Sequence, residues 1–121
     1  MARNIKEYDL QQLAQLSMFF ANERVTQFVP DEFWYETLEP QLEDQLDTFV
    51  KFRDQIDRRR FLSDFARACV SFGIRGLDAP LFKSKVEHVI ASMVENLDAQ
   101  TTNNLLFFFQ HENEIRNSTL V

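Results

Sequence analysis

The chain has 121 residues, enough for one domain with its own core, and 45% of them are hydrophobic, which excludes a disordered chain. It contains only two Gly and three Pro, too few for the many turns of an all-β domain, so we expect long helices. The net charge of -6 disfavours nucleic acid and anionic membranes as partners and favours other proteins.

The first predicted helix runs from about Asp9 to Asn22. Asp9 and Gln12 have the spacing of a capping box, in which the carboxylate accepts from the backbone and the glutamine side chain bonds back. Apolar residues then recur at helical intervals, so one face of this helix is expected to be buried. They are Leu10, Leu13, Leu16 and Phe20.

A second helix is expected from about Asp31 to Phe52, after a connection that ends at Pro30. Asp31 is expected to cap its start. Because Pro40 removes a helical hydrogen bond within this segment, we expect the helix to be kinked or broken there. The helix is strongly acidic, and we expect a solvated face; such a face can also meet a basic partner surface. Its acidic residues are Glu32, Glu36, Glu39, Glu43, Asp44 and Asp47.

The third predicted helix begins at Asp57 and ends at Gly73. Its apolar stripe includes Phe61 and Phe65, which recur at helical spacing. Gly73 followed by Ile74 matches a Schellman stop, in which glycine adopts the left-handed conformation and the next apolar residue packs back on the helix.

The fourth and fifth predicted helices each follow an aspartate. Asp78 is expected to cap the fourth helix, with Pro80 in the first turn, where its missing N–H costs nothing. Asp98 is expected to cap a fifth helix over residues 99–115. The apolar stripe of the fourth helix consists of Phe82, Val86, Val89, Ile90, Met93 and Leu97.

These five amphipathic helices predict a single all-α domain over residues 1–121, with frayed ends at about 1–8 and 117–121. They can be arranged as antiparallel helical hairpins in a short α-solenoid or as an irregular bundle. Sliding the second helix onto the fourth pairs Trp34 with Phe82, whereas the third and fifth helices align at a different offset. The pattern therefore leaves both arrangements open.

Three consecutive phenylalanines, Phe107, Phe108 and Phe109, lie in the fifth predicted helix. Successive helix residues point about 100° apart, so the three rings cannot all join one buried stripe. We expect one ring to fill the core and another to be available to a partner protein. Trp34 and Tyr35 form a second aromatic cluster that overfills its stripe. They belong either to the core or, because Trp and Tyr are enriched at interface hot spots, to a partner-binding surface.

Basic residues are concentrated in the third predicted helix. One interpretation pairs this candidate basic face with the acidic second helix or with an acidic partner protein. The alternative is RNA, because basic side chains interleaved with aromatic rings grip phosphates and stack on bases. The acidic net charge disfavours RNA. The residues of this face are Arg58, Arg59, Arg60 and Arg67.

The sequence contains no motif for catalysis, metal binding or nucleotide binding, so we predict neither an enzyme nor a cofactor. His88 and His111 each lack the second His, three or four residues away, that a helical zinc site requires. Cys69 is the only cysteine, so no internal disulfide forms, and a buried apolar role is expected for it. No apolar stretch reaches the length of a membrane span and no targeting peptide is visible, which predicts a soluble, intracellular protein.

Three segments share a pattern of leucine, alanine and aromatic residues: Leu10–Ala21, Phe61–Ala68 and Thr101–Phe107. This pattern resembles the helical-hairpin repeats of organellar proteins, the pentatricopeptide-like and heptatricopeptide-like families, including those related to FAST kinases. The resemblance implies an α-solenoid fragment in a mitochondrion or plastid, where such proteins bind RNA or act as structural subunits of ribosomes and respiratory complexes. No base-reading residues match, and the acidic balance departs from the RNA-binding members.

These features predict a non-enzymatic helical interaction protein, a structural or adaptor subunit of a larger multiprotein assembly such as a mitochondrial respiratory or ribosomal complex. Its partners would be the protein subunits of that complex. The alternative is an RNA-contacting helical-repeat protein of an organelle.

Overall fold

A computed structural model describes residues 9–49, 51 and 54–120, apart from the side chains of Gln55 and of residues 110–120. This part of the chain is all-α and contains no strand. None of its helices combines the length and the apolar character needed to cross a membrane. The elements in chain order are α1 (Leu10–Ala21), the 3₁₀-helix η2 (Thr26–Phe28), the π-helix η3 (Phe33–Leu38), α2 (Glu39–Phe49), α3 (Gln55–Arg75), α4 (Pro80–Ala91), the 3₁₀-helix η4 (Val94–Asn96) and α5 (Ala99–Leu120).

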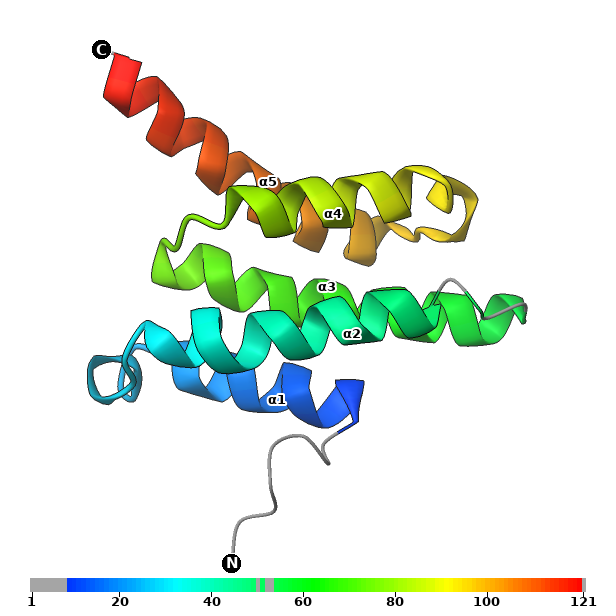
Figure 1. Cartoon of the computed structure of the whole chain (residues 1–121), viewed down its shortest axis with the longest axis horizontal. Coiled ribbons are helices and arrows are strands. Elements are labelled where there is room, and N and C mark those ends of the chain that lie inside the picture. The colour runs from blue at the N-terminus through cyan, green and yellow to red at the C-terminus, as the bar shows by residue number, and fades with distance from the viewer. Residues whose placement is uncertain (1–8, 50, 52–53, 121) are drawn as a thin grey trace, which may run out of the picture.

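The helices form two layers (Figure 1). α1, α3 and α5 lie side by side and run in the same direction, with α3 between the other two and packed against both. α2 and α4 lie in front of this layer in the view of Figure 1 and run in the opposite direction. Short connections produce this alternation, because a short loop returns the chain beside the helix that it leaves.

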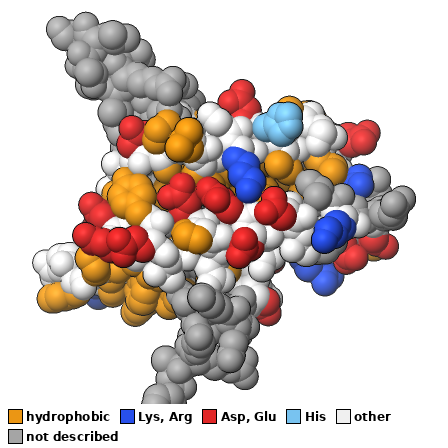
Figure 2. Space-filling view, viewed as in Figure 1, with side chains coloured by type: hydrophobic (Ala, Val, Ile, Leu, Met, Phe, Trp, Pro, Cys, Tyr) orange, Lys and Arg blue, Asp and Glu red, His pale blue; other side chains and the backbone are white. Residues whose placement is uncertain are grey.

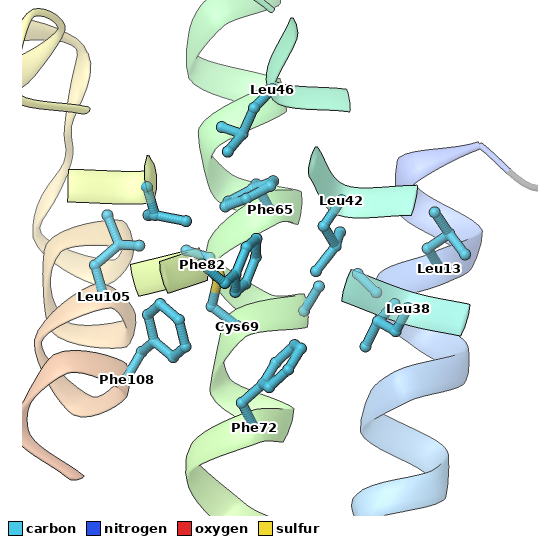
Figure 3. Packing of buried hydrophobic residues seen from close by; sticks show 14 of the residues in the cluster. Leu13, Leu38, Leu42, Leu46, Phe65, Cys69, Phe72, Phe82, Leu105 and Phe108 are labelled. Carbon is cyan, nitrogen blue, oxygen red and sulfur yellow. The ribbon is translucent and has the colours of Figure 1, made fainter. Parts of the chain in front are cut away.

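The core fills the space between the two layers (Figure 3). Phe65, Cys69 and Phe72 of α3 lie at its centre, facing Leu42 of α2 and Phe82 of α4. All five side chains are completely buried. Burying one large apolar side chain contributes roughly 1.5–3 kcal/mol, so this cluster contributes substantially to the stability of the fold. The sides of the core are closed by Leu13 of α1 and by Leu105 and Phe108 of α5.

The predicted capping box at the start of α1 is confirmed. The Asp9 carboxylate accepts from the Gln12 N–H at 2.8 Å, and the Gln12 side chain accepts from the Asp9 N–H at 2.9 Å. α1 ends at Ala21, and Leu10 and Leu13 of the predicted stripe are buried. The capping box and the apolar stripe are therefore sufficient to predict this helix from the sequence.

Pro40 does not break the second helix, because the chain is wound as a π-helix just before it. η3 continues directly into α2, and the Glu39 N–H bonds to the carbonyl of Trp34, five residues back. In an α-helix the Pro40 ring would meet the carbonyl of Glu36, and the wider π turn relieves this clash. α2 ends at Phe49, while residues 50 and 52 of the predicted range lie outside the described residues.

α3 begins two residues before the predicted start. Asp54, not Asp57, is its N-cap: the Asp54 carboxylate accepts from the N–H groups of Ile56 and Asp57 at 2.8 and 3.2 Å. Asp57 instead lies in the first turn, where a negative charge favours the helix dipole.

The Schellman stop predicted at Gly73 and Ile74 is wrong. Gly76 is the residue in the left-handed conformation, with φ at 71°, and the Leu77 N–H bonds back to the Phe72 carbonyl at 3.0 Å. Both candidate pairs satisfy the motif, but Leu77 is buried and Ile74 is exposed. The stop therefore forms where the following apolar residue reaches the core.

α4 starts with Pro80 in its first turn, as predicted, but without the predicted aspartate cap. Its N-cap is Ala79, which makes no side-chain hydrogen bond. The helix ends at Ala91, before the predicted stripe is complete. Met93 and Leu97 nevertheless pack against the core from the segment that contains η4.

Asp98 caps α5 as predicted, because its carboxylate accepts from the Thr101 N–H at 2.7 Å. The helix extends beyond the predicted end at residue 115 and runs to Leu120. Of the segments expected to fray, residues 1–8 and 121 lie outside the described residues, and residues 117–120 belong to α5.

Candidate functional site

The three consecutive phenylalanines of α5 occupy three different environments. Phe108 is completely buried, and its ring centroid lies 6.0 Å from that of Phe72. Phe107 is 43% exposed and lies over Gly73 of α3. Phe109 is half-buried beside Phe108, with the two ring centroids 5.2 Å apart. Phe108 is therefore a core residue, and Phe107 offers the most ring surface to a partner.

Trp34 also belongs to the core. It is completely buried, and its indole N–H donates to the Ser71 hydroxyl at 3.0 Å. A chain of ring contacts connects it to α1: the Phe33 centroid lies 5.1 Å from that of Trp34 and 4.9 Å from that of Phe20. Phe20 in turn contacts Phe19 at 5.9 Å. Trp34 therefore supports the surface around it rather than forming part of that surface.

Arg75 contacts both Trp34 and the connection between α1 and η3, and so links the two. Its guanidinium carbon lies 4.5 Å from the Trp34 ring centroid. One nitrogen donates to the carbonyl and hydroxyl oxygens of Thr26, and the other pairs with the Asp31 carboxylate. Asp31 therefore does not cap the second helix with its side chain, contrary to prediction. The Arg75 side chain is only 14% exposed but the Asp31 side chain is 55% exposed, so solvent screens the ion pair more than it screens the bonds to Thr26.

Tyr35 lies at the surface and ties η3 to the segment before α4. Its hydroxyl donates to the Asp78 carbonyl at 3.0 Å. Partial burial and the nearby Asp31 carboxylate raise the pKa of this phenol above its usual value. The phenol therefore stays neutral at physiological pH and keeps its hydrogen bond.

Exposed apolar side chains gather where α1 ends and where η3 and α4 begin. We call this surface the aromatic end and define it by Phe19, Phe28, Tyr35 and Leu81. Phe28 and Leu81 are 77% and 85% exposed. Figure 2 shows hydrophobic side chains gathered at the left-hand end of the molecule, with acidic side chains between them. A concentration of exposed apolar surface of this kind is typical of interaction sites.

The charges that surround the aromatic end are mostly negative. Arg24 is an exposed cation in the connection between α1 and η2, while Arg75 is occupied beneath the surface. Carboxylates outnumber these cations on the same segments, so the aromatic end lies in a negative potential. The exposed carboxylates are Glu23, Asp31, Glu32, Glu36 and Asp78.

The arginines of the candidate basic face are distributed around α3. Consecutive side chains on a helix point about 100° apart, so residues 58–60 cannot share one side. Arg67 lies 3.8 Å from Asp64 on the same helix. Hydrogen bonds to the first turn of α5 lower the pKa of Asp98, and the charge of Arg59 lowers it further. These two arginines therefore face carboxylates of α3 and of the α5 cap rather than the acidic α2. The predicted face comprises Arg58, Arg59, Arg60 and Arg67.

A cleft of about 460 Å³ lies beside the start of α1. Burial raises the pKa of its Asp64 carboxyl, Arg67 opposes this shift and Asp9 adds to it. The carboxylates would suit a cationic group, but the described residues contain no cluster of three or more potential metal ligands. The cleft is lined by Asp9, Leu10, Gln11, Gln45, Asp57, Arg60, Phe61 and Asp64.

Lys83 is a buried cation, 3% exposed, whose ammonium nitrogen lies 5.1 Å from the Phe108 ring centroid. Cys69 is completely buried, as predicted. Burial raises the pKa of its thiol well above the usual range, and the Lys83 charge opposes this shift in part. The thiol therefore remains protonated and unreactive. His88 is exposed on α4, and the His111 side chain lies outside the described residues.

Two structural features of this region were missed by reasoning from the sequence. Arg75 binds Thr26 and Asp31, which are 49 and 44 residues away along the chain. Gly73 accommodates the Phe107 ring across the contact between α3 and α5. No local pattern signals either contact, because both partners come together only when the layers pack. No protein-family model, no curated protein and no solved structure matches this chain.

Proposed function

We propose that this chain is a non-enzymatic helical interaction protein that serves as a structural or adaptor subunit of a larger assembly. The aromatic end is the observation that carries this proposal. Phe28 and Leu81 are 77% and 85% exposed, although Trp34 of the following helix η3 and Phe82 beside Leu81 in α4 are completely buried. Apolar area transferred from water to a partner favours association by about 25 cal/mol per Å².

The arrangement of the helices also supports this function. Helices of one layer lie side by side around α3, and those of the other layer pack in front of them. Such stacked helices leave their outer faces and ends available to partners, while the core holds these surfaces in fixed positions. A rigid scaffold that displays apolar side chains suits an adaptor better than it suits a chemical catalyst.

The distribution of arginines weakens the RNA alternative. A phosphate-binding surface needs several cations on one side, and charge repulsion must not exceed their attraction. Arg67 lies beside Asp64, and Arg59 acts on Asp98. These neighbouring carboxylates reduce the positive potential that a nucleic acid would meet.

The test of this proposal is the mass of the full chain in a native extract of its own cells, compared with that of the purified chain. We expect the chain in the extract to migrate with other proteins at a mass well above that of its 14.3 kDa monomer. We also expect the purified chain to bind a dye that reports exposed apolar surface. A chain that migrates as a monomer in the native extract would contradict the proposal.

A further inference from the structure

The most exposed ring of the aromatic end stands on a rigid support. Phe28 closes the 3₁₀-helix η2, and Arg75 donates to the carbonyl and hydroxyl of Thr26 at the start of the same turn, at 2.5 and 2.6 Å. Arg75 itself lies against Trp34, whose indole N–H is held by Ser71. A ring displayed on a turn that is already fixed loses little conformational entropy when it binds.

The turn beneath Phe28 contributes to the stability of the folded chain, but the exposed Phe28 ring contributes little. Thr26 is tied down by Arg75, and the neighbouring Val29 packs against the core. Phe28 lies between them and leaves most of its own surface in water. Its ring therefore adds little to the stability of the isolated chain, and a contact with another molecule is what would bury it.

The segments that carry the aromatic end are mostly negative, although Arg24 is an exposed cation among them, and this balance favours one kind of partner. Glu32, Glu36 and Asp78 are exposed carboxylates on the segments that carry the aromatic end. A second copy of the chain would bring like carboxylates together in a symmetric contact, which is unfavourable. Anionic lipid and RNA phosphates are repelled by the same charges. A protein surface rich in Lys and Arg is attracted by them.

We infer that the aromatic end is the docking site for a partner protein whose contact surface is apolar at its centre and carries Lys and Arg around it. Phe28 is the anchor of this contact, and Leu81 and Tyr35 extend it toward α4. The surrounding carboxylates pair with the partner's basic rim, which favours encounter and orients the two surfaces. This inference rests on the proposed function and specifies its surface and its partner chemistry.

A defined pair of peptides tests the chemistry directly. Both are amphipathic helices with Leu on one face, and the other face carries Lys in one peptide and Glu in its twin. We expect the full chain to bind the Lys peptide at least about tenfold more tightly than the Glu twin, with the difference falling as salt is raised. Equal binding of the two peptides would overturn the inference.

Matched variants locate the contact. Phe28→Ala and Leu81→Ala are expected to weaken binding of the Lys peptide about tenfold each, as for hot-spot residues. The control is Val94→Ala, because Val94 is 61% exposed and η4 lies at the opposite end of the molecule (Figure 1). We expect this control to bind like the wild type, and thermal unfolding should show that all three variants are folded. A loss in Val94→Ala as large as that in Phe28→Ala would refute the assignment.

Cross-linking in cells then identifies the physiological partner surface. The photoreactive residue p-benzoylphenylalanine replaces Phe28 in one full chain and Val94 in another. We expect about tenfold more cross-linked protein from position 28, joined to a partner segment in which apolar residues are flanked by Lys or Arg. Cross-links from position 28 mainly to a second copy of the chain, to lipid or to RNA would overturn the inference.

The outcome also distinguishes this inference from the proposed function. If the complexes in the native extract persist in both the Phe28→Ala and the Leu81→Ala variant, the inferred docking site is wrong, but the proposed adaptor function still stands. A wild-type chain that is monomeric in that extract would sink both.

Discussion

The ring of Phe107 lies directly over Gly73, where a Cβ would come within 2.6 Å of the Phe107 Cε2 atom. Gly73 stands inside α3, a position where glycine costs about 1 kcal/mol relative to alanine. Its missing side chain is what allows α5 to bring Phe107 against α3. The glycine that resembled a helix stop in the sequence is therefore a contact site between two helices.

This contact predicts a change of sign in a double-mutant cycle. Gly73→Ala alone is expected to lower the free energy of unfolding by about 1–3 kcal/mol, because the new methyl group displaces the ring. In a Phe107→Ala background the same change is expected to raise it by about 0.5–1 kcal/mol through helix propensity. Urea unfolding of the four proteins measures both values. Equal effects in the two backgrounds would show that the ring does not restrict residue 73.

Phe107 and Phe108 are expected to differ sharply when truncated. Phe108→Ala removes a buried ring that contacts Phe72 and Phe82, so a loss of about 3–5 kcal/mol is expected. Phe107→Ala removes a ring that is already half in water, and its cost should be about 1 kcal/mol. Denaturant unfolding measures the two losses. Similar losses would contradict the assignment of Phe108 to the core.

Arg75 is expected to matter far more than an arginine at the surface. Arg75→Met keeps the packing on Trp34 but removes the hydrogen bonds to Thr26 and the pairing with Asp31, so a loss of about 1–3 kcal/mol is expected. The matched control is Arg67→Met, whose ion pair with Asp64 spans 3.8 Å at a more exposed position. That control should change the free energy of unfolding by less than about 0.5 kcal/mol. Comparable losses would mean that the Arg75 bonds are replaced by water.

We expect the contribution of Glu39 to the stability of the folded chain to become more favourable as the pH falls. Burial, followed by the charge of Glu43, raises the pKa of Glu39 above its usual 4.5. The folded state therefore binds this proton more tightly, and the charged form opposes folding at neutral pH. Glu39→Gln should raise the melting temperature at pH 7, and its advantage should disappear as the pH falls below about 4.5, the unfolded value. A constant advantage at every pH would indicate a cause other than ionisation.

We expect the contribution of Asp98 to the stability of the folded chain to become less favourable as the pH falls, the opposite of Glu39. Hydrogen bonds to Thr101 lower the pKa of Asp98 below its usual 3.8, so the charged form is favoured in the folded state. This stabilisation is present above 3.8 and is lost as the pH falls through the lower folded value. The melting temperature of Asp98→Asn should therefore lie below that of the wild type at pH 7, and the difference should shrink as the pH falls below 3.8. A difference in melting temperature between the two proteins that stays constant as the pH is lowered would argue against a charged cap.

Several elements of the fold were accessible from the sequence because their signals are local. Asp9 and Gln12 lie three residues apart, and their reciprocal bonds form whenever the first turn of α1 forms. Asp98 acts on its own helix start in the same way. Gly73 and Gly76 show the limit of such signals, because both are followed by an apolar residue and only packing decides which of those residues is buried.

Composition and periodicity were thus sufficient to predict the all-α class of the described residues, the presence of α1 to α5 and the apolar face of most of these helices. Tertiary structure alone decided that Phe108 fills the core, that Phe107 rests on Gly73, and that Arg75 fixes the turn beneath Phe28. The physical reason is the separation along the sequence between the residues that interact. Helix formation depends on neighbours within one or two turns, whereas these contacts join residues more than twenty-five positions apart, which the packing of the two layers brings together.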